Sequence, residues 1–206
     1  MDGIERSDLG SRRGRVDRIN ALSDDLLVLL LASLGCAAAA ARASVLSRRW
    51  RGLWTHLRQI VFRGVALPFL EAAVGRVSPA VSLLEIHVPV PVPVLAGRLA
   101  WLEPAGIRSL LRAAARTKPE EFVLVLPRRS IQCVIDADLP CFHRATSIVL
   151  DSFFLLRVPD GVEFPVLETL SLTGCIVVDL DALLSRCPRL RVFRLKCRVF
   201  TPTANT

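Results

Sequence analysis

The chain has 206 residues, a hydrophobic content of 52% and a formal net charge of +8. The hydrophobic content excludes a chain that is mostly disordered, and the length allows one or two domains with a sizeable core. The charge alone is compatible with nucleic acid, an acidic protein or an anionic membrane surface as a partner. The choice among these partners therefore depends on how the residues are arranged.

Residues 1–15 are polar, contain glycine and are rich in arginine, which predicts a flexible basic leader. A helix is predicted to begin after Ser23, a good N-cap that two aspartates follow in the first turn. Its apolar positions are Leu22, Leu26, Leu30 and Leu34 at a spacing of four, with Leu27 and Leu31 beside them. This stripe is wide for so short a helix, so we expect it to be covered from more than one side.

The uncharged run 26–41 follows a region with several arginines, an arrangement similar to a signal peptide. Two aspartates abut the run, and it is short for a bilayer span, which favours a folded segment and no membrane contact. The secreted alternative predicts cleavage near Ala41. After Gly35, the alanines at 37–41 predict a second short helix.

The stretch "SVLSRRWRGLW" (44–54) combines three arginines with two of the three tryptophans. As a helix it places Leu46, Trp50, Leu53 and Trp54 on one face and most arginines on another. Stacking of bases on the tryptophans would need rings and cations on the same side. The pattern therefore favours packing or a protein interface over nucleic acid.

Downstream, "VSLLEIHV" (81–88) predicts a strand, and "PVPVPV" (89–94) suits an extended loop. Residues 103–119 predict a helix with an apolar face (Ile107, Leu110, Leu111, Ala114) and an arginine row (Arg108, Arg112, Arg116). The row is interpreted as a solvated face, with a basic patch as the alternative.

Four further strands are predicted at 121–127, 145–153, 167–175 and 190–198, beginning 24, 22 and 23 residues apart. The third matches L-x-x-L-x-L-x-x-C through Leu167, Leu170, Leu172 and Cys175, which is the leucine-rich-repeat pattern at its usual period. The fourth matches through Leu190, Phe193 and Leu195, and a short helix is predicted between the two. Such repeats stack into a solenoid, in which Cys175 is expected to bond the backbone of its turn.

Chemistry-bearing motifs do not emerge from this sequence. The cysteines at 36, 133, 141, 175, 187 and 197 form no closely spaced ligand pair, so we expect buried thiols in a reducing compartment, no metal and no cofactor. The "DAD" at 136–138 is interpreted as an acid pair in a loop. We find no hydrolase, nucleotide or zinc-protease motif and predict that the protein is not an enzyme.

The segment 17–57 resembles an F-box of the large plant F-box/leucine-rich-repeat family. The resemblance is carried by Leu22 before the acidic pair, the doublet at 26–27, "SVLSRRWRGLW" and "IVF" (60–62). It implies an α+β protein with a three-helix F-box and a short α/β solenoid. The expected organisation is a leader (1–15), an F-box (16–63), a connecting segment (64–80) and repeats (81–206), the last of these short or truncated at the C-terminus.

The resemblance implies a substrate adaptor of an SCF-type cullin–RING ubiquitin ligase in the cytoplasm or nucleus. The F-box is expected to bind a Skp-type linker, and through it cullin, by Leu22, Leu26, Leu27, Leu30, Leu31, Val45, Leu46, Trp50 and Trp54. A protein substrate is expected on concave strand positions: Ser147, Val149, Asp151, Thr169, Ser171, Thr173, Val192, Arg194 and Lys196. The alternative is a basic repeat scaffold that binds nucleic acid or an acidic protein without ligase assembly.

Overall fold

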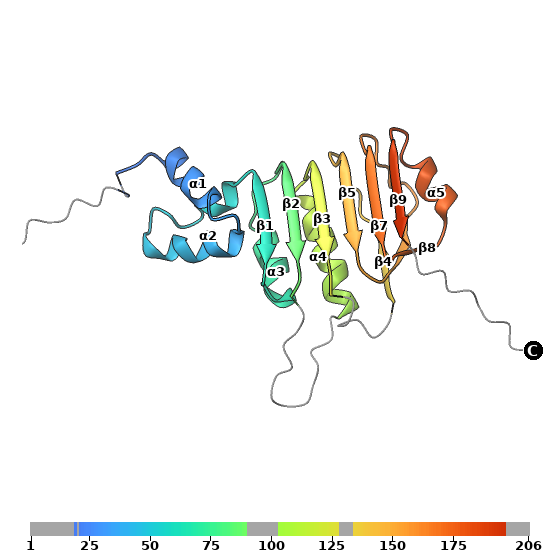
Figure 1. Ribbon diagram of the computed structural model, residues 1–206, viewed down its shortest axis with the longest axis horizontal. Coiled ribbons are helices and arrows are strands. Elements are labelled where there is room, and N and C mark those ends of the chain that lie inside the picture. The colour runs from blue at the N-terminus through green and yellow to red at the C-terminus, as the bar shows by residue number, and fades with distance from the viewer. Residues whose placement is uncertain (1–18, 20, 90–102, 128–133, 197–206) are drawn as a thin grey trace, which may run out of the picture.

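The computed structural model describes residues 19, 21–89, 103–127 and 134–196. Six parallel strands form the main sheet in the order β1-β2-β3-β5-β7-β9 (Figure 1). Their bounds are Gln59–Arg63 (β1), Leu83–His87 (β2), Glu121–Val125 (β3), Ser147–Asp151 (β5), Thr169–Thr173 (β7) and Val192–Lys196 (β9). The order of these strands in the sheet is their order along the chain, so the chain advances in one direction across the sheet.

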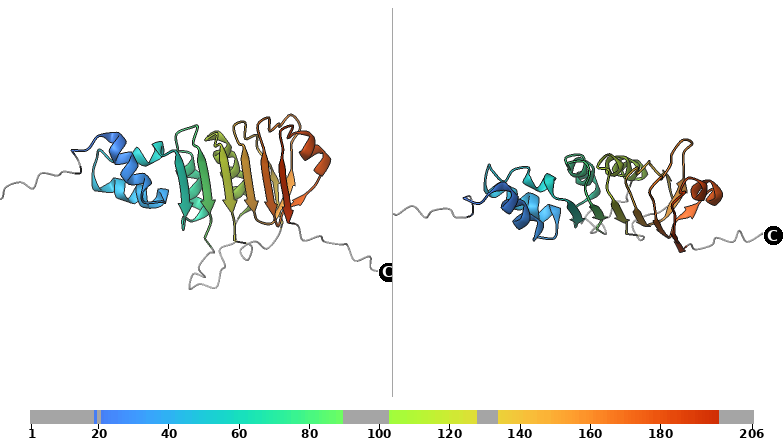
Figure 2. Two further views of the ribbon diagram at one scale, coloured as in Figure 1. Left: turned by 45° about the horizontal axis from the view of Figure 1, so that its top comes forward. Right: turned by 90° about the horizontal axis from the view of Figure 1, so that it is seen from above.

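Helices lie on one side of this sheet, as the view from above in Figure 2 shows. α3 (Leu67–Val74) and α4 (Pro104–Arg116) pack against each other there, and α5 (Leu180–Ser185) follows β7. The predicted apolar face of α4 is confirmed, because Ile107, Leu110, Leu111 and Ala114 are buried while Arg112 and Arg116 are exposed. Each crossover returns through a helix or a short strand on that side, which explains why all strands of the sheet are parallel.

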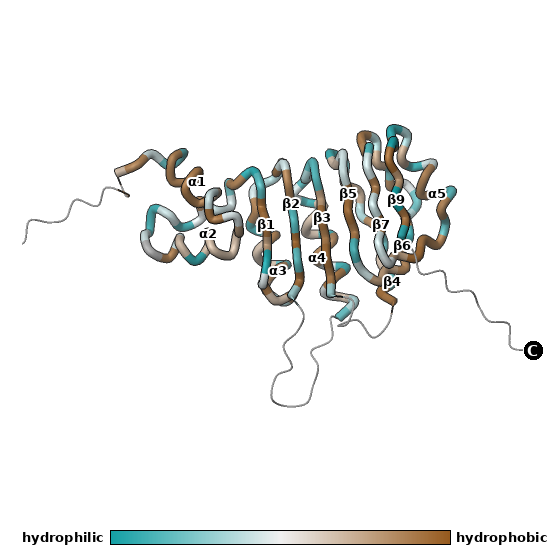
Figure 3. The backbone as a smooth tube through the Cα atoms, in the orientation of Figure 1, coloured by the Kyte–Doolittle hydropathy of each residue, from teal (hydrophilic) through white to brown (hydrophobic). Residues whose placement is uncertain are grey.

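Strand residues alternate between the helix side of the sheet and the opposite side, and the hydropathy colours change along the strands in Figure 3. In the strands from β1 to β7 the second and fourth residues are buried: Ile60 and Phe62, Leu84 and Ile86, Phe122 and Leu124, Ile148 and Leu150, Leu170 and Leu172. The first, third and fifth residues form the opposite face, which no described helix covers. We call this second surface the open face.

The predicted helix after Ser23 is confirmed as α1 (Asp24–Ala32), with the Leu26 amide donating to the Ser23 hydroxyl at 3.4 Å. Gly35 at φ +63° then turns the chain into α2 (Ala37–Ala43). The apolar run 26–41 is thus divided between two short helices. No helix in the described ranges is long and apolar enough to cross a membrane.

The prediction of one α-helix through 44–54 is wrong. The chain forms a 3₁₀ turn at Ser44–Leu46, becomes extended at Ser47 and is left-handed at Gly52 (φ +86°) before a second 3₁₀ turn at Leu53–His56. This path directs Trp54 into the core, edge-on to Phe62 with ring centroids 6.4 Å apart. The expected three-helix module therefore contains two α-helices and two 3₁₀ turns, and we call residues 21–57 the helical unit.

The helical unit and the sheet share one hydrophobic core. The cluster of buried side chains runs from Leu31 of α1, through Ala37, Ala40 and Trp54, to Ile60 of β1 and onward to Cys187. α2 packs on β1, the strand at the edge of the sheet. Among the residues that the structure describes, no separate core marks a border between the helical unit and the repeats.

The predicted strands at 81–88, 121–127, 145–153, 167–175 and 190–198 are confirmed as β2, β3, β5, β7 and β9. The sheet begins earlier than expected, because β1 includes the "IVF" assigned to the F-box, and α3 lies in the segment expected to connect F-box and repeats. Cys175 is fully buried and its thiol lies 3.7 Å from the Ser152 carbonyl oxygen and 3.8 Å from that of Thr173, as its position in the repeat predicts.

A second parallel sheet was not predicted. Its strands are β4 (Ile135–Asp138), β6 (Phe154–Arg157) and β8 (Ile176–Val177), in that order. The "DAD" at 136–138 therefore lies in a strand and not in a loop, with Ala137 buried between two exposed aspartates. Asp136 forms a salt bridge with Arg157 at 3.2 Å, so at least one of the acids ties neighbouring strands together.

Candidate functional site

The surface of α1 divides into a buried and an exposed row of leucines. Leu27 and Leu31 are 0% and 1% exposed, whereas four others remain open to solvent: Leu26 (48%), Leu29 (64%), Leu30 (45%) and Leu34 (46%). Val45, in the 3₁₀ turn after α2, is 73% exposed. We call these five exposed side chains the leucine patch. Leu26, Leu29 and Leu30 are neighbours on α1 at spacings of three and four, and exposed apolar side chains gathered in this way mark a protein interaction site more often than a solvated face.

The nine residues expected at a linker interface separate into distinct environments. Leu26, Leu30 and Val45 are exposed, Leu22 and Trp50 are half-buried, and Leu27, Leu31 and Trp54 are buried; the Leu46 side chain is outside the described part of the structure. The sequence prediction of the linker-binding residues did not include Leu29 or Leu34. Leu29 lies one position away from the predicted apolar stripe, and Leu34 was placed in the stripe but not assigned to the interface. The buried members of the set, Leu27, Leu31 and Trp54, contribute to the internal packing of the helical unit.

A salt bridge fixes α1 to the irregular segment that follows α2. Arg49 pairs with Asp24 at 2.8 Å, and the Asp24 side chain is 63% exposed. The arginines of "SVLSRRWRGLW" thus lie on the outside while Trp54 is enclosed. Trp54 is therefore not available for stacking on a base, and Trp50 is half-buried.

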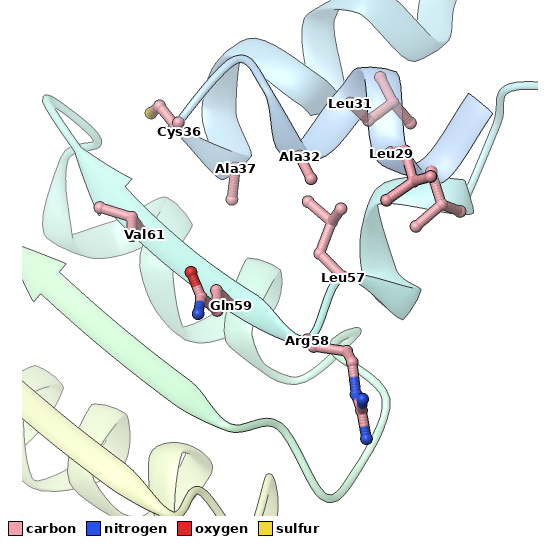
Figure 4. Close-up of a pocket in the computed structure, with 11 residues that line it drawn as sticks. Leu29, Leu31, Ala32, Cys36, Ala37, Leu57, Arg58, Gln59 and Val61 are labelled. Atoms are coloured by element: carbon pink, nitrogen blue, oxygen red, sulfur yellow. The ribbon is translucent and has the colours of Figure 1, made fainter. Parts of the chain in front are cut away.

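A groove of about 310 Å³ lies where the helical unit meets β1. Figure 4 shows Leu29, Leu31 and Ala32 of α1 above it, Leu57 at its centre, and Gln59 and Val61 of β1 below. Arg58 extends away from the groove in this view. The groove connects the exposed side of α1 with the edge of the sheet.

The nine positions expected to face a substrate all lie on the open face. They fall into three rows across neighbouring strands: Ser147, Thr169 and Val192; Val149, Ser171 and Arg194; Asp151, Thr173 and Lys196. β1, β2 and β3 extend the same rows with residues that the sequence prediction did not include: Gln59, Leu83 and Glu121; Val61, Glu85 and Val123; Arg63, His87 and Val125. The signal for these was the period-2 pattern of 121–127 and 81–88, which predicted strands but no facing surface.

At the β1–β2 end of the open face, Glu85 is held by two neighbours. Arg63 donates to its carboxylate at 2.9 Å, and His87 Nε2 lies 2.6 Å from the same oxygen. The hydrogen bond from Arg63 is the main cause that lowers the pKa of Glu85, and the contact with His87 adds to it. Glu85 is therefore a charged and satisfied group, not a poised acid.

Metal and catalytic chemistry find little support in the described ranges. They contain no group of three or more histidine, cysteine or acidic side chains placed to hold a metal ion. Cys141 contacts His143 at 3.1 Å, but burial raises the pKa of this thiol, opposite to the activation of a nucleophile. Cys133 and Cys197 lie outside the described residues, as do residues 90–94 of the extended segment expected at 89–94.

One strand per 22 or 23 residues from β5 to β9, helices on one side and a parallel sheet on the other define a leucine-rich-repeat protein. Comparison with known proteins specifies the kind: residues 107–204 match the family model described as "FBD-associated F-box protein At5g56370, LRR repeats". The repeat region is thus similar to the repeats of this family, which confirms the resemblance to plant F-box/leucine-rich-repeat proteins. Neither a curated protein nor a solved structure matches the chain.

Proposed function

We propose that the protein is a substrate-recognition adaptor of an SCF-type cullin–RING ubiquitin ligase. In this proposal the helical unit, within the F-box range 16–63, binds a Skp-type linker, and the repeats hold a protein substrate on the open face. The chain itself contributes binding and no catalysis. The proposed compartment is the cytoplasm or nucleus of a plant cell, where thiols such as the buried Cys187 stay reduced.

The observation that carries the proposal is the leucine patch on a helical unit that is otherwise well packed. α1 buries Leu27 and Leu31 but leaves three leucines exposed, with Leu34 exposed just after its end, so its apolar surface exceeds what the chain's own core uses. An apolar partner surface is the usual means of covering such a patch. The family match of the repeats supports a Skp-type linker, the partner of an F-box, as the protein that covers the patch.

The structure also supports the division of labour. The leucine patch lies at the β1 end of the molecule, and the open face extends away from it across six strands (Figure 1). A linker bound at α1 therefore leaves the open face accessible. The shared core between α1 and β1 holds the two surfaces in a fixed relation.

The test is binding of a purified Skp-type linker to the full-length chain, measured by calorimetry or pull-down. Leu26→Asp with Leu30→Asp changes only exposed side chains and is expected to weaken binding by at least about 30-fold, the effect of losing interface hot spots. Leu180→Asp with Leu184→Asp, on α5 and 39% and 38% exposed, is the matched control and is expected to bind as the unaltered chain does.

Circular dichroism of each variant verifies the fold. No linker binding by the unaltered chain at micromolar concentration refutes the adaptor proposal. Equal loss in both double variants refutes the assignment to α1. Salt-sensitive binding to nucleic acid in the absence of linker binding supports the alternative of a basic repeat scaffold.

A further inference from the structure

From β2 to β9 the open face changes from carboxylates to cations, and the Arg63 cation of β1 is paired with Glu85. The carboxylates of this face lie on β2, β3 and β5 (Glu85, Glu121 and Asp151), whereas β9 carries Arg194 and Lys196. Val123 of β3 and Val149 of β5 are register neighbours and half-buried, and they form an apolar centre on the strands that carry two of these carboxylates. A ligand that fits this face must follow the same order.

The two cations of β9 have no acidic partner in the described structure. Both side chains are exposed, and neither takes part in any of the salt bridges between described residues. Their neighbours on β7 are hydroxyl residues, since Ser171 is opposite Arg194 and Thr173 is opposite Lys196. Two cations beside hydroxyl donors form a surface that favours carboxylates.

The spacing suits a protein segment in extended conformation. Residues two apart on one strand are separated by about 6.7 Å, and neighbouring strands by about 4.8 Å. The path from β3 to β9 crosses three strand spacings, about 14 Å, which an extended segment covers in about four residues.

Nucleic acid fits this surface poorly. None of the eighteen outward positions of the six strands carries a phenylalanine or tryptophan on which a base could stack. A polyanion crossing the sheet would also meet three carboxylates before it reached β9. The pattern selects a ligand with separate apolar and acidic parts.

We propose that the open face binds an extended protein segment in which apolar residues, seated over Val123 and Val149, are followed by acidic residues that pair with Arg194 and Lys196. As the identity of the ligase substrate, this rests on the proposed function; as binding, it needs no linker. The orientation follows from the register, with the acidic end of the segment toward β9.

The probe is a fluorescein-labelled synthetic peptide of ten residues with two central leucines followed by three aspartates, titrated with the full-length chain and read by fluorescence anisotropy. Arg194→Glu with Lys196→Glu is expected to weaken binding by about tenfold or more, because two attractive contacts become repulsive. Replacing the three aspartates of the peptide by lysines is expected to restore binding to that variant.

The matched control is Arg76→Glu with Arg112→Glu, both exposed and both outside the open face. It changes the net charge of the chain equally and is expected to leave peptide binding unchanged. Equal loss in the two variants overturns the proposal, since it indicates only the overall charge. Equal binding of a peptide with asparagines in place of aspartates also overturns it, as does tighter binding of a phosphoserine peptide or a single-stranded oligonucleotide.

Linker binding measured on the same proteins separates the two proposals. The β9 variant is expected to bind the Skp-type linker as the unaltered chain does, because β9 is at the far end of the sheet from α1 (Figure 1). Peptide binding without linker binding contradicts the adaptor role and leaves the segment recognition standing. Linker binding without peptide binding supports the adaptor role and overturns the proposed segment recognition.

Discussion

Leu30 and Leu31 are neighbours on α1 with opposite environments, which allows the shared core to be tested by two substitutions. Leu31 is 1% exposed and belongs to the cluster that continues into the sheet, while Leu30 is 45% exposed. Leu31→Ala removes three carbon atoms, which at about 0.8 kcal/mol per buried methylene gives about 2.4 kcal/mol. The groove of about 310 Å³ beside Leu31 admits water and limits the added cavity penalty, so we expect a total loss of about 2–3 kcal/mol.

Leu30→Ala is expected to cost less than about 1 kcal/mol, since a surface leucine gives up little burial. The measurement is urea-induced unfolding followed both by far-UV circular dichroism and by tryptophan fluorescence, because Trp54 packs in the same cluster as Leu31. With a shared core, the two signals are expected to change together and to shift together in the Leu31 variant. Equal losses for the two variants, or a fluorescence transition that separates from the dichroism transition, refute the idea that the helical unit and the repeats form one cooperative core.

Two further predictions concern titratable groups. Burial raises the pKa of the Cys187 thiol to about 11; at Cys36, partial burial acts in the same direction, but backbone hydrogen bonds at the start of α2 and the charge of Arg42 outweigh it and leave the pKa lowered. A thiol reagent at pH 8 is therefore expected to label Cys36 first and Cys187 only on unfolding, and peptide mass spectrometry measures the order of labelling. Simultaneous labelling of both cysteines in the folded chain contradicts this prediction. The lowered pKa of Glu85 means that its pairing stabilises the fold above its usual value of 4.5, and this stabilisation is lost as the pH falls through the folded value. Glu85→Gln is expected to be less stable at pH 7 in urea melts, and the difference from the unaltered chain is expected to shrink as the pH falls through the folded pKa of Glu85. A difference that does not change with pH contradicts the assignment.

The repeat region was predictable because its signal is local and repeated. Leu170 and Leu172 alternate with polar residues at period two, Leu167 precedes Leu170 by three residues, and similar strands return every 22 to 24 residues. All three are 0% exposed, so the periodicity correctly identified the inward side of the strand. Cys175 needed only its place in the pattern.

The helical unit was less predictable, because tertiary packing overrode the helical spacing. Residues 44–54 satisfy a helical stripe, yet Gly52 adopts a left-handed conformation and the chain turns so that Trp54 reaches Phe62. A spacing of four also cannot tell which side of α1 is covered: Leu26 and Leu27 are adjacent, and only contacts with distant residues bury Leu27. The short strands of the second sheet, two to four residues long, are below the length at which alternation can be recognised.

Because α2 packs directly on β1, the number of repeats sets the distance between the leucine patch and a ligand bound at the far end of the open face. Because no linker separates the leucine patch from the sheet, each strand places the next row of the open face about 4.8 Å farther from α1. Insertion or loss of one repeat would move a ligand held at β9 in a step of that size and rotate it by the small twist between strands. A flexible connection would blur such steps, whereas this architecture turns the count of repeats into a distance.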